Sequence, residues 1–180
     1  MSKTLEILKT KDKVHRMVEL ISFNEPYVTV LGHDSHGESM IDSVLEKLGG
    51  DYVVSIYEVD DLRQVHRDRR IDSVINECEE VSNIHPNLLV IRLERKIGDT
   101  MLKDLRNKVR QISHQAREIC IRVIFISQVN KTLPGFIPSS KGDLSFVGGG
   151  QVIYGADLVI VAIGENVEVI KNRYGIEELL

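Results

Sequence analysis

Apolar residues follow two different spacings along this chain, and the two spacings alternate. Between residues 14 and 21 they recur at i, i+3, i+4 and i+7, which is typical of one face of a helix. Short runs of β-branched residues predict buried strands instead. Strands are expected at residues 27–31, 52–57, 87–93, 121–127, 157–163 and 167–173. Further helices are expected at residues 41–48, 61–81 and 99–119.

Strands that alternate with helices predict an α/β domain with a mainly parallel central sheet. The last two strands are separated by Gly164-Glu165-Asn166, which is a hairpin signal, so the sheet is expected to end in a C-terminal β-hairpin. Residues 129–150 are polar and glycine-rich, and we expect a long functional loop there. The predicted organisation is an N-terminal helix over 1–24 and a single core domain over 25–180.

The composition narrows the class of protein only slightly. The chain has 180 residues, with 42% hydrophobic and 28% charged residues, which is ordinary for a soluble globular domain. A net charge of −4 argues against a protein coated in positive potential but allows a local basic groove. Cys78 and Cys120 lie far apart and suit reduced, buried thiols in a cytoplasmic protein. No apolar run approaches the roughly 18 residues of a membrane span, so no membrane association is expected.

The segment GHDSHGES, residues 32–39, lies between an expected strand and an expected helix. It nearly matches the phosphate-binding pattern G-x-x-x-x-G-K-[ST], because Gly32, Gly37 and Ser39 are in register. Glu38, however, occupies the lysine position. The segment is therefore a vestigial phosphate loop, an ordinary turn that is capped by a side chain, or an active site for an anion or a metal.

The metal interpretation depends on Asp34 and His36. The letters DSHG are similar to the Asp-x-His-Gly opening of metallophosphatases, in which both residues are metal ligands. Such enzymes need further ligands downstream. This sequence offers only His85, within NIHPN, and His114, on an expected helix.

Three segments in the second half of the chain together resemble one protein superfamily. They are VIFISQVNK, GGGQVIYGADLVIVA and VEVIKNRYG, in that order. The set resembles the core of the RecA-like ATPases, which include the RecA-type recombinases with their phage relatives and the DnaB-type replicative helicases. The resemblance covers about residues 27 to 175 and implies a RecA-like three-layer domain.

The resemblance also implies roles for particular residues. Gln128 would be the sensor glutamine that reads the γ-phosphate, and Glu58 would be the catalytic glutamate. Lys171 and Arg173 would reach into the ATP site of a neighbouring subunit, and alternation along the strand would place them on the same face as the valines before them. The DNA-contacting loop would include Lys131, Lys141, Gly148, Gly149 and Gly150. Each of these residues also has an ordinary explanation, as a strand end or a solvated loop.

Two departures from the family pattern affect the chemistry. Glu38 replaces the lysine that attracts phosphate, and Arg92 stands where the magnesium-holding aspartate should end the third strand. One unit-charge contact at about 4 Å is worth about 4 kcal/mol at an effective dielectric near 20, so reversing its sign changes binding by several kcal/mol. We therefore expect no ATP hydrolysis by the family mechanism and no resident cofactor, and binding of ATP with magnesium is doubtful.

The sequence thus predicts a catalytically degenerate RecA-like protein that works by assembly. It would form a homo-oligomer, or a hetero-oligomer with an active RecA-like ATPase, in DNA replication or recombination. One alternative is an ATP-independent protein that binds single-stranded DNA. Another is an enzyme, either metallophosphatase-like or an unusual NTP hydrolase.

Overall fold

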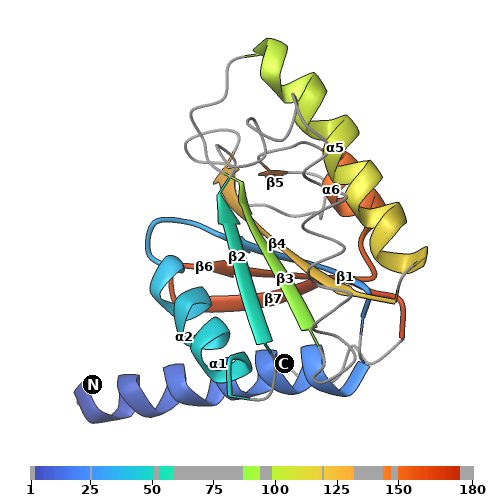
Figure 1. Cartoon of the computed structure of the whole chain (residues 1–180). Coiled ribbons are helices and arrows are strands. Elements are labelled where there is room, and N and C mark those ends of the chain that lie inside the picture. The colour runs from blue at the N-terminus through green and yellow to red at the C-terminus, as the bar shows by residue number, and fades with distance from the viewer. Residues whose placement is uncertain are drawn as a thin grey trace.

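The computed structural model of the chain describes residues 3–24, 26–50, 53–58, 87–93, 99–118, 120–131, 144–146 and 150–174. The helices are α1 (Lys3–Asn24), α2 (Glu38–Leu48), α5 (Asp99–Glu118) and α6 (Gly150–Gly155) (Figure 1). The strands are β1 (Val28–His33), β2 (Val53–Glu58), β3 (Asn87–Leu93), β4 (Arg122–Lys131), β5 (Leu144–Phe146), β6 (Leu158–Ile163) and β7 (Asn166–Asn172). The helix predicted over 61–81 lies outside the described residues.

The strands form a sheet in the order β2-β3-β4-β1-β6-β7. The first five strands in this order are parallel to their neighbours, and β7 pairs antiparallel with β6. β1 lies inside the sheet, and all six of its residues are buried, as expected for a parallel strand covered on both faces. The predicted mixed α/β fold with a mostly parallel sheet is confirmed.

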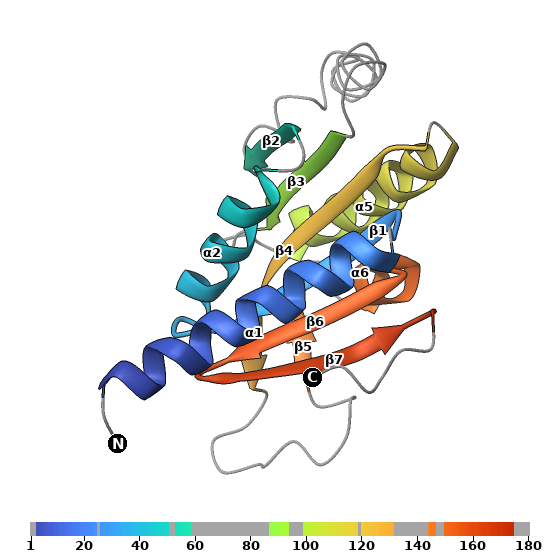
Figure 2. The same cartoon turned by 90° about the horizontal axis from the view of Figure 1, so that it is seen from below.

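Helices cover both faces of the sheet (Figure 2). α1 and α2 pack on one face, where Met17, Ile41 and Leu48 meet the side chains of Leu31 and Ile126. α5 packs on the other face through three buried side chains that the helical spacing predicted, Val109, Ile112 and Ala116. The two apolar clusters are separated by the sheet, so its central strands contribute alternate side chains to each.

The N-terminal end of α1 extends past the sheet in both views (Figures 1 and 2). Among the described side chains of this helix, the buried ones begin at Val14 and continue through Met17, Leu20 and Ile21. Val14, Met17 and Ile21 belong to the apolar face that the spacing predicted, Val18 of that face is only partly buried, and Leu20 is buried in addition. None of the described helices is both long and apolar enough to cross a membrane.

Two expectations about the chain need correction. The expected loop over 129–150 is partly ordered as strand, because β4 continues to Lys131 and pairs antiparallel with β5. Cys120 is exposed, not buried, and it has a φ of 58° in the turn between α5 and β4. A residue that ends a helix in this left-handed conformation lies at the surface, and glycine is the usual residue there. Cys78 lies outside the described residues.

Candidate functional site

The carboxyl end of β1 is the first place to look for a ligand site. After β1 the chain runs to α2, which packs on one face of the sheet. After the neighbouring β4 it runs to β5 and α6, and α6 packs with α5 on the opposite face. Ligands of open α/β sheets bind in the crevice where adjacent strands diverge in this way. His33 and Gln128, the register partners at this point, end up side by side.

The loop after β1 is organised around the carboxylate of Asp34. Its Oδ1 accepts hydrogen bonds from the backbone amides of His36 at 3.1 Å and Gly37 at 2.8 Å. The amide of Gly164, in the turn between β6 and β7, lies 3.0 Å from both carboxylate oxygens. The protein's own anion therefore occupies amide groups that a phosphate would need in a phosphate-binding loop.

The protonation of Asp34 agrees with this arrangement. Burial raises the pKa of Asp34, but the hydrogen bonds from the amides of Gly164, Gly37 and His36 and the charge of His36 outweigh that effect, so the pKa lies below its ordinary value. Asp34 is consequently ionised at neutral pH and holds the amides tightly.

Gly37 owes its place in the loop to close packing. A Cβ on Gly37 would lie 2.3 Å from the carbonyl oxygen of Ala162 in β6. Gly37 has φ −80° and ψ −12°, and Gly164 is the one described glycine with a positive φ. Gly32 is a buried residue inside β1. Close packing against β6 therefore explains the glycine at position 37, and Gly32 is part of the buried strand β1.

Of the two residues that depart from the family pattern, Glu38 is exposed and Arg92 contacts α2. Glu38 is the exposed first residue of α2, and Ser39, beside it, is also exposed. Arg92, near the end of β3, forms an ion pair with Asp42 of α2. Arg92 therefore connects the sheet to α2, where the family pattern would place a metal-holding acid.

His33 and Gln128 are two described polar residues at this crevice. His33 is 4% exposed, and its Nδ1 lies 3.0 Å from the carbonyl oxygen of Asp34. The Oε1 atom of Gln128 is buried and has no hydrogen-bond partner in the described part of the chain. A buried acceptor without a donor is costly, so this oxygen can receive a hydrogen bond from a ligand or from water.

The remaining predicted residues are only partly described. His36 is exposed, with its Nδ1 3.3 Å from Ser35 Oγ. Within the described ranges, no group of three or more His, Cys, Asp or Glu side chains could hold a metal ion, so Asp34 and His36 have no third ligand there. Glu58 ends β2 opposite Arg92, but its side chain lies outside the described residues. Further predicted loop residues outside the description are Lys141, Gly148 and Gly149, whereas Gly150 begins α6.

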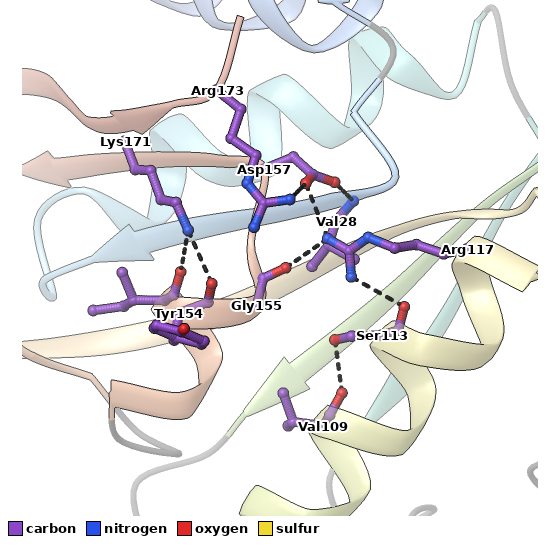
Figure 3. Close-up of polar contacts among 10 residues, drawn as sticks. Val28, Val109, Ser113, Arg117, Tyr154, Gly155, Asp157, Lys171 and Arg173 are labelled. Atoms are coloured by element: carbon purple, nitrogen blue, oxygen red, sulfur yellow. Dashed lines mark hydrogen bonds and ion pairs between the residues drawn. The ribbon is translucent and has the colours of Figure 1, made fainter.

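A second polar cluster lies at the opposite, amino-terminal edge of the sheet (Figure 3). Asp157, just before β6, is 3% exposed. Its Oδ1 accepts hydrogen bonds from Arg117 and Arg173, each at 2.9 Å, and its Oδ2 accepts one from the amide of Val28 at 3.1 Å. Arg117 also donates to the carbonyl of Gly155 at 2.7 Å. This buried carboxylate therefore ties α5, β1, β6 and the residue after β7 together.

The prediction that Lys171 shares a face of its strand with Val169 is wrong. Val169 lies opposite Ile160, whereas Lys171 lies opposite Val159, so Ile170 is an extra residue that forms a β-bulge. Val169 packs toward α1 and α2, while Lys171 turns to the α5 and α6 side. The sequence does carry a signal of the bulge, because Val169 and Ile170 are adjacent apolar residues that interrupt the alternation.

The predicted basic pair is engaged within its own chain. Lys171 Nζ donates to the carbonyls of Ile153 at 3.1 Å and Tyr154 at 2.9 Å, which are among the last carbonyls of α6. Burial lowers the pKa of Lys171, and the nearby charge of Arg173 lowers it further. Their predicted role in a neighbouring ATP site remains a prediction.

Asp157 and Arg117 were not predicted as site residues. The available signal was an acidic residue placed directly before the apolar run LVIVA, where a carboxylate becomes buried and needs partners. Its partners come from 40 residues earlier and 16 residues later, and no local spacing relates them.

Comparison with family models of proteins finds no match to this chain, and comparison with curated protein sequences finds none either.

Proposed function

We propose that this chain is a degenerate RecA-like protein that acts by assembling with partner subunits and does not hydrolyse ATP. The observation that carries the proposal is the carboxylate of Asp34, which takes the amides of His36, Gly37 and Gly164. A triphosphate would have to displace this anion and also approach Glu38. Both effects oppose nucleotide binding at the loop.

The RecA-like part of the proposal rests on the sequence segments described above and on an agreement in general architecture. Helices cover both faces of a mostly parallel sheet, and the loop follows a central buried strand. Gln128 lies beside His33 at the carboxyl edge, where the resemblance places a residue that senses phosphate. A cellular setting in DNA replication or recombination follows from the resemblance alone.

Assembly is supported by the shape of α1. The N-terminal end of this helix extends past the sheet and past α2 (Figures 1 and 2). In ring helicases of the family that the chain resembles, a preceding helix often packs on the adjacent subunit. We therefore assign the projecting part of α1 to contact with another subunit.

Two measurements test the proposal. Phosphate release from ATP with magnesium, measured with and without single-stranded DNA, is expected to stay at the level of buffer. Light scattering after size exclusion is expected to show an oligomer, either of the chain alone or with a RecA-like ATPase. Deleting residues 1–11, which precede the first described buried residue of α1, should reduce the number of subunits in the oligomer. Steady ATP turnover, or a monomer under all these conditions, contradicts the proposal.

A further inference from the structure

An open groove lies between α5 and α6, at the edge of the sheet opposite the GHDSHGES loop. Its volume is about 710 Å³, within the usual size range of a ligand pocket. The lining residues are Arg110, Ser113, His114, Arg117, Glu118, Tyr154 and Gly155. Figure 3 shows Ser113 and Arg117 on α5 and Tyr154 on α6, with the Asp157 cluster beside them.

Arg117 is held in a fixed orientation at this groove. Its Nη1 donates to the carbonyl of Ser113 at 3.3 Å, and its Nη2 donates to Gly155 and Asp157. An arginine has five N–H donors, so two donors of Arg117 have no partner among the described residues. Its side chain is 32% exposed. A guanidinium whose position is already fixed loses little entropy when a carboxylate binds to its free donors.

Positive charge exceeds negative charge around the groove. Arg110 is exposed, and its guanidinium forms no ion pair or hydrogen bond with any described residue. Among the described residues, the groove and its neighbouring cluster contain four basic side chains (Arg110, Arg117, Lys171 and Arg173) and two acidic ones (Glu118 and Asp157). These described side chains sum to a net charge of +2, whereas the whole chain carries −4.

Tyr154 gives the groove an aromatic wall. Its side chain is 81% exposed, the most exposed large hydrophobic side chain among the described residues. Lys171 donates to the carbonyl of Tyr154 and so fixes the backbone that carries the ring. Tyrosine and arginine are the residues most enriched where a few side chains dominate protein binding.

We propose that this groove binds a short segment of a partner protein in which one or two carboxylates lie next to an aromatic or apolar side chain. The carboxylates bind to Arg110 and to the free donors of Arg117, and the apolar side chain packs on Tyr154. The inference rests on the proposed function by assembly and names the chemistry of the partner.

The number and arrangement of charges favour an acidic peptide over a nucleic acid. Affinity for a nucleic-acid backbone comes from several basic side chains that neutralise successive phosphates. Here Arg117 and Arg173 are already paired with Asp157, and Glu118 stands at the groove itself. Among the basic side chains that the structure describes here, only Arg110 and part of Arg117 have no partner in the described ranges, which matches one or two carboxylates and does not match a polyanion.

The test is a selection from a displayed library of random short peptides on the full chain. Bound peptides are then counter-selected on Arg110→Gln and Tyr154→Ala. Enriched peptides are expected to combine Asp or Glu with an aromatic or large apolar residue. No enrichment, or enrichment of peptides without carboxylates, overturns the inference.

The best peptide is then measured by fluorescence anisotropy against matched variants. Arg110→Gln and Tyr154→Ala should each weaken binding by about tenfold or more. The control variants Arg16→Gln and Phe23→Ala lie on α1, outside the lining of the groove, so they should not change peptide binding. Phe23 is a matched control for Tyr154 because it is 79% exposed. Equal effects of the two aromatic variants overturn the inference. A different result would overturn the inference in favour of a nucleic acid. In that result, oligo(dT) binds the wild-type chain, the Arg110→Gln variant binds it more weakly, and no acidic peptide binds.

These outcomes are separate from those of the assembly proposal. ATP turnover by the chain contradicts the proposed function but leaves peptide binding to be measured on its own. If the chain assembles normally but binds no acidic peptide, only the inference about the groove is contradicted, and the proposed function by assembly is not. If both hold, Tyr154→Ala should also reduce assembly with the partner while leaving self-association through α1 unchanged.

Discussion

The substitution Asp157→Asn tests whether the buried carboxylate at the amino edge of the sheet holds the surrounding elements together. The side chain receives two guanidinium groups on Oδ1 and the amide of Val28 on Oδ2. Asparagine has the same shape but only one accepting oxygen. If that oxygen faces Arg117 and Arg173, the new NH₂ group faces the N–H of Val28. If the amide is flipped, the NH₂ group faces the two guanidinium groups.

The size of the effect follows from the exposure of each partner. The side chains of Arg117 and Arg173 are 32% and 53% exposed, so water can replace part of each contact, and each loss is worth at most about 1 kcal/mol. Val28 is 0% exposed, and a buried N–H without an acceptor costs about 1–3 kcal/mol. Because asparagine can satisfy one side only and takes the less costly orientation, we expect a loss of about 1–2 kcal/mol, or about 2–8 °C in Tm.

The measurement is urea unfolding followed by circular dichroism, with Asp42→Asn as the matched control. Asp42 also pairs with an arginine, Arg92, but its side chain is 53% exposed. Its substitution should therefore change the free energy of unfolding by about 1 kcal/mol or less. If Asp157→Asn costs no more than Asp42→Asn, the reasoning about the buried carboxylate is refuted.

Three further predictions concern the loop and one turn. Gly37→Ala should lower Tm, because its Cβ would lie 2.3 Å from the carbonyl oxygen of Ala162 and overpacking costs about 1–3 kcal/mol. Gly49→Ala is the control and should be near neutral, because the nearest atom to its Cβ lies at 3.4 Å. Equal shifts in Tm for the two variants would contradict the packing argument. Asp34 has a lowered pKa in the fold, so its stabilisation is present above its unfolded pKa and is lost as pH falls through its folded pKa. Asp34→Asn should therefore reduce the free energy of unfolding at pH 7, and its difference from wild type should shrink between about pH 5 and pH 2. A difference that is independent of pH would contradict this prediction. Cys120→Gly should raise stability by about 1 kcal/mol in thermal unfolding, because it relieves a left-handed conformation, and any loss of stability would contradict it.

The sequence was most informative where burial depends on local spacing. The run NLLVIRL predicts β3 with its observed ends, and the helical spacing around Val109 and Ile112 predicts the buried face of α5. In both elements the period of the apolar residues follows directly from the geometry of a strand or a helix. The parallel arrangement of the sheet was predicted because strands alternate with helices along the chain, and such an order is typical of a parallel sheet.

The polar contacts were not predictable from local spacing, because their partners are distant along the chain. The carboxylate of Asp34 bonds the amide of Gly37 just before α2, but its additional bond to Gly164 joins residues 130 positions apart. The bulge at Ile170 redirects Lys171, and the adjacent apolar pair Val169 and Ile170 does not by itself show which residue is the extra one. Such features are set by how elements pack, and they are visible only once the sheet order is known.

Titration of the chain with a fluorescent ATP analogue in the presence of magnesium is the most direct test of the proposed loss of ATPase function. The carboxylate of Asp34 and the charge of Glu38 both oppose a phosphate at the loop. We predict no saturable binding at micromolar concentrations. Restoring the lysine with Glu38→Lys should not create such binding, because Asp34 still occupies the amides of His36 and Gly37. A micromolar Kd for the wild-type chain would contradict the proposal that it acts by assembly in place of ATP hydrolysis.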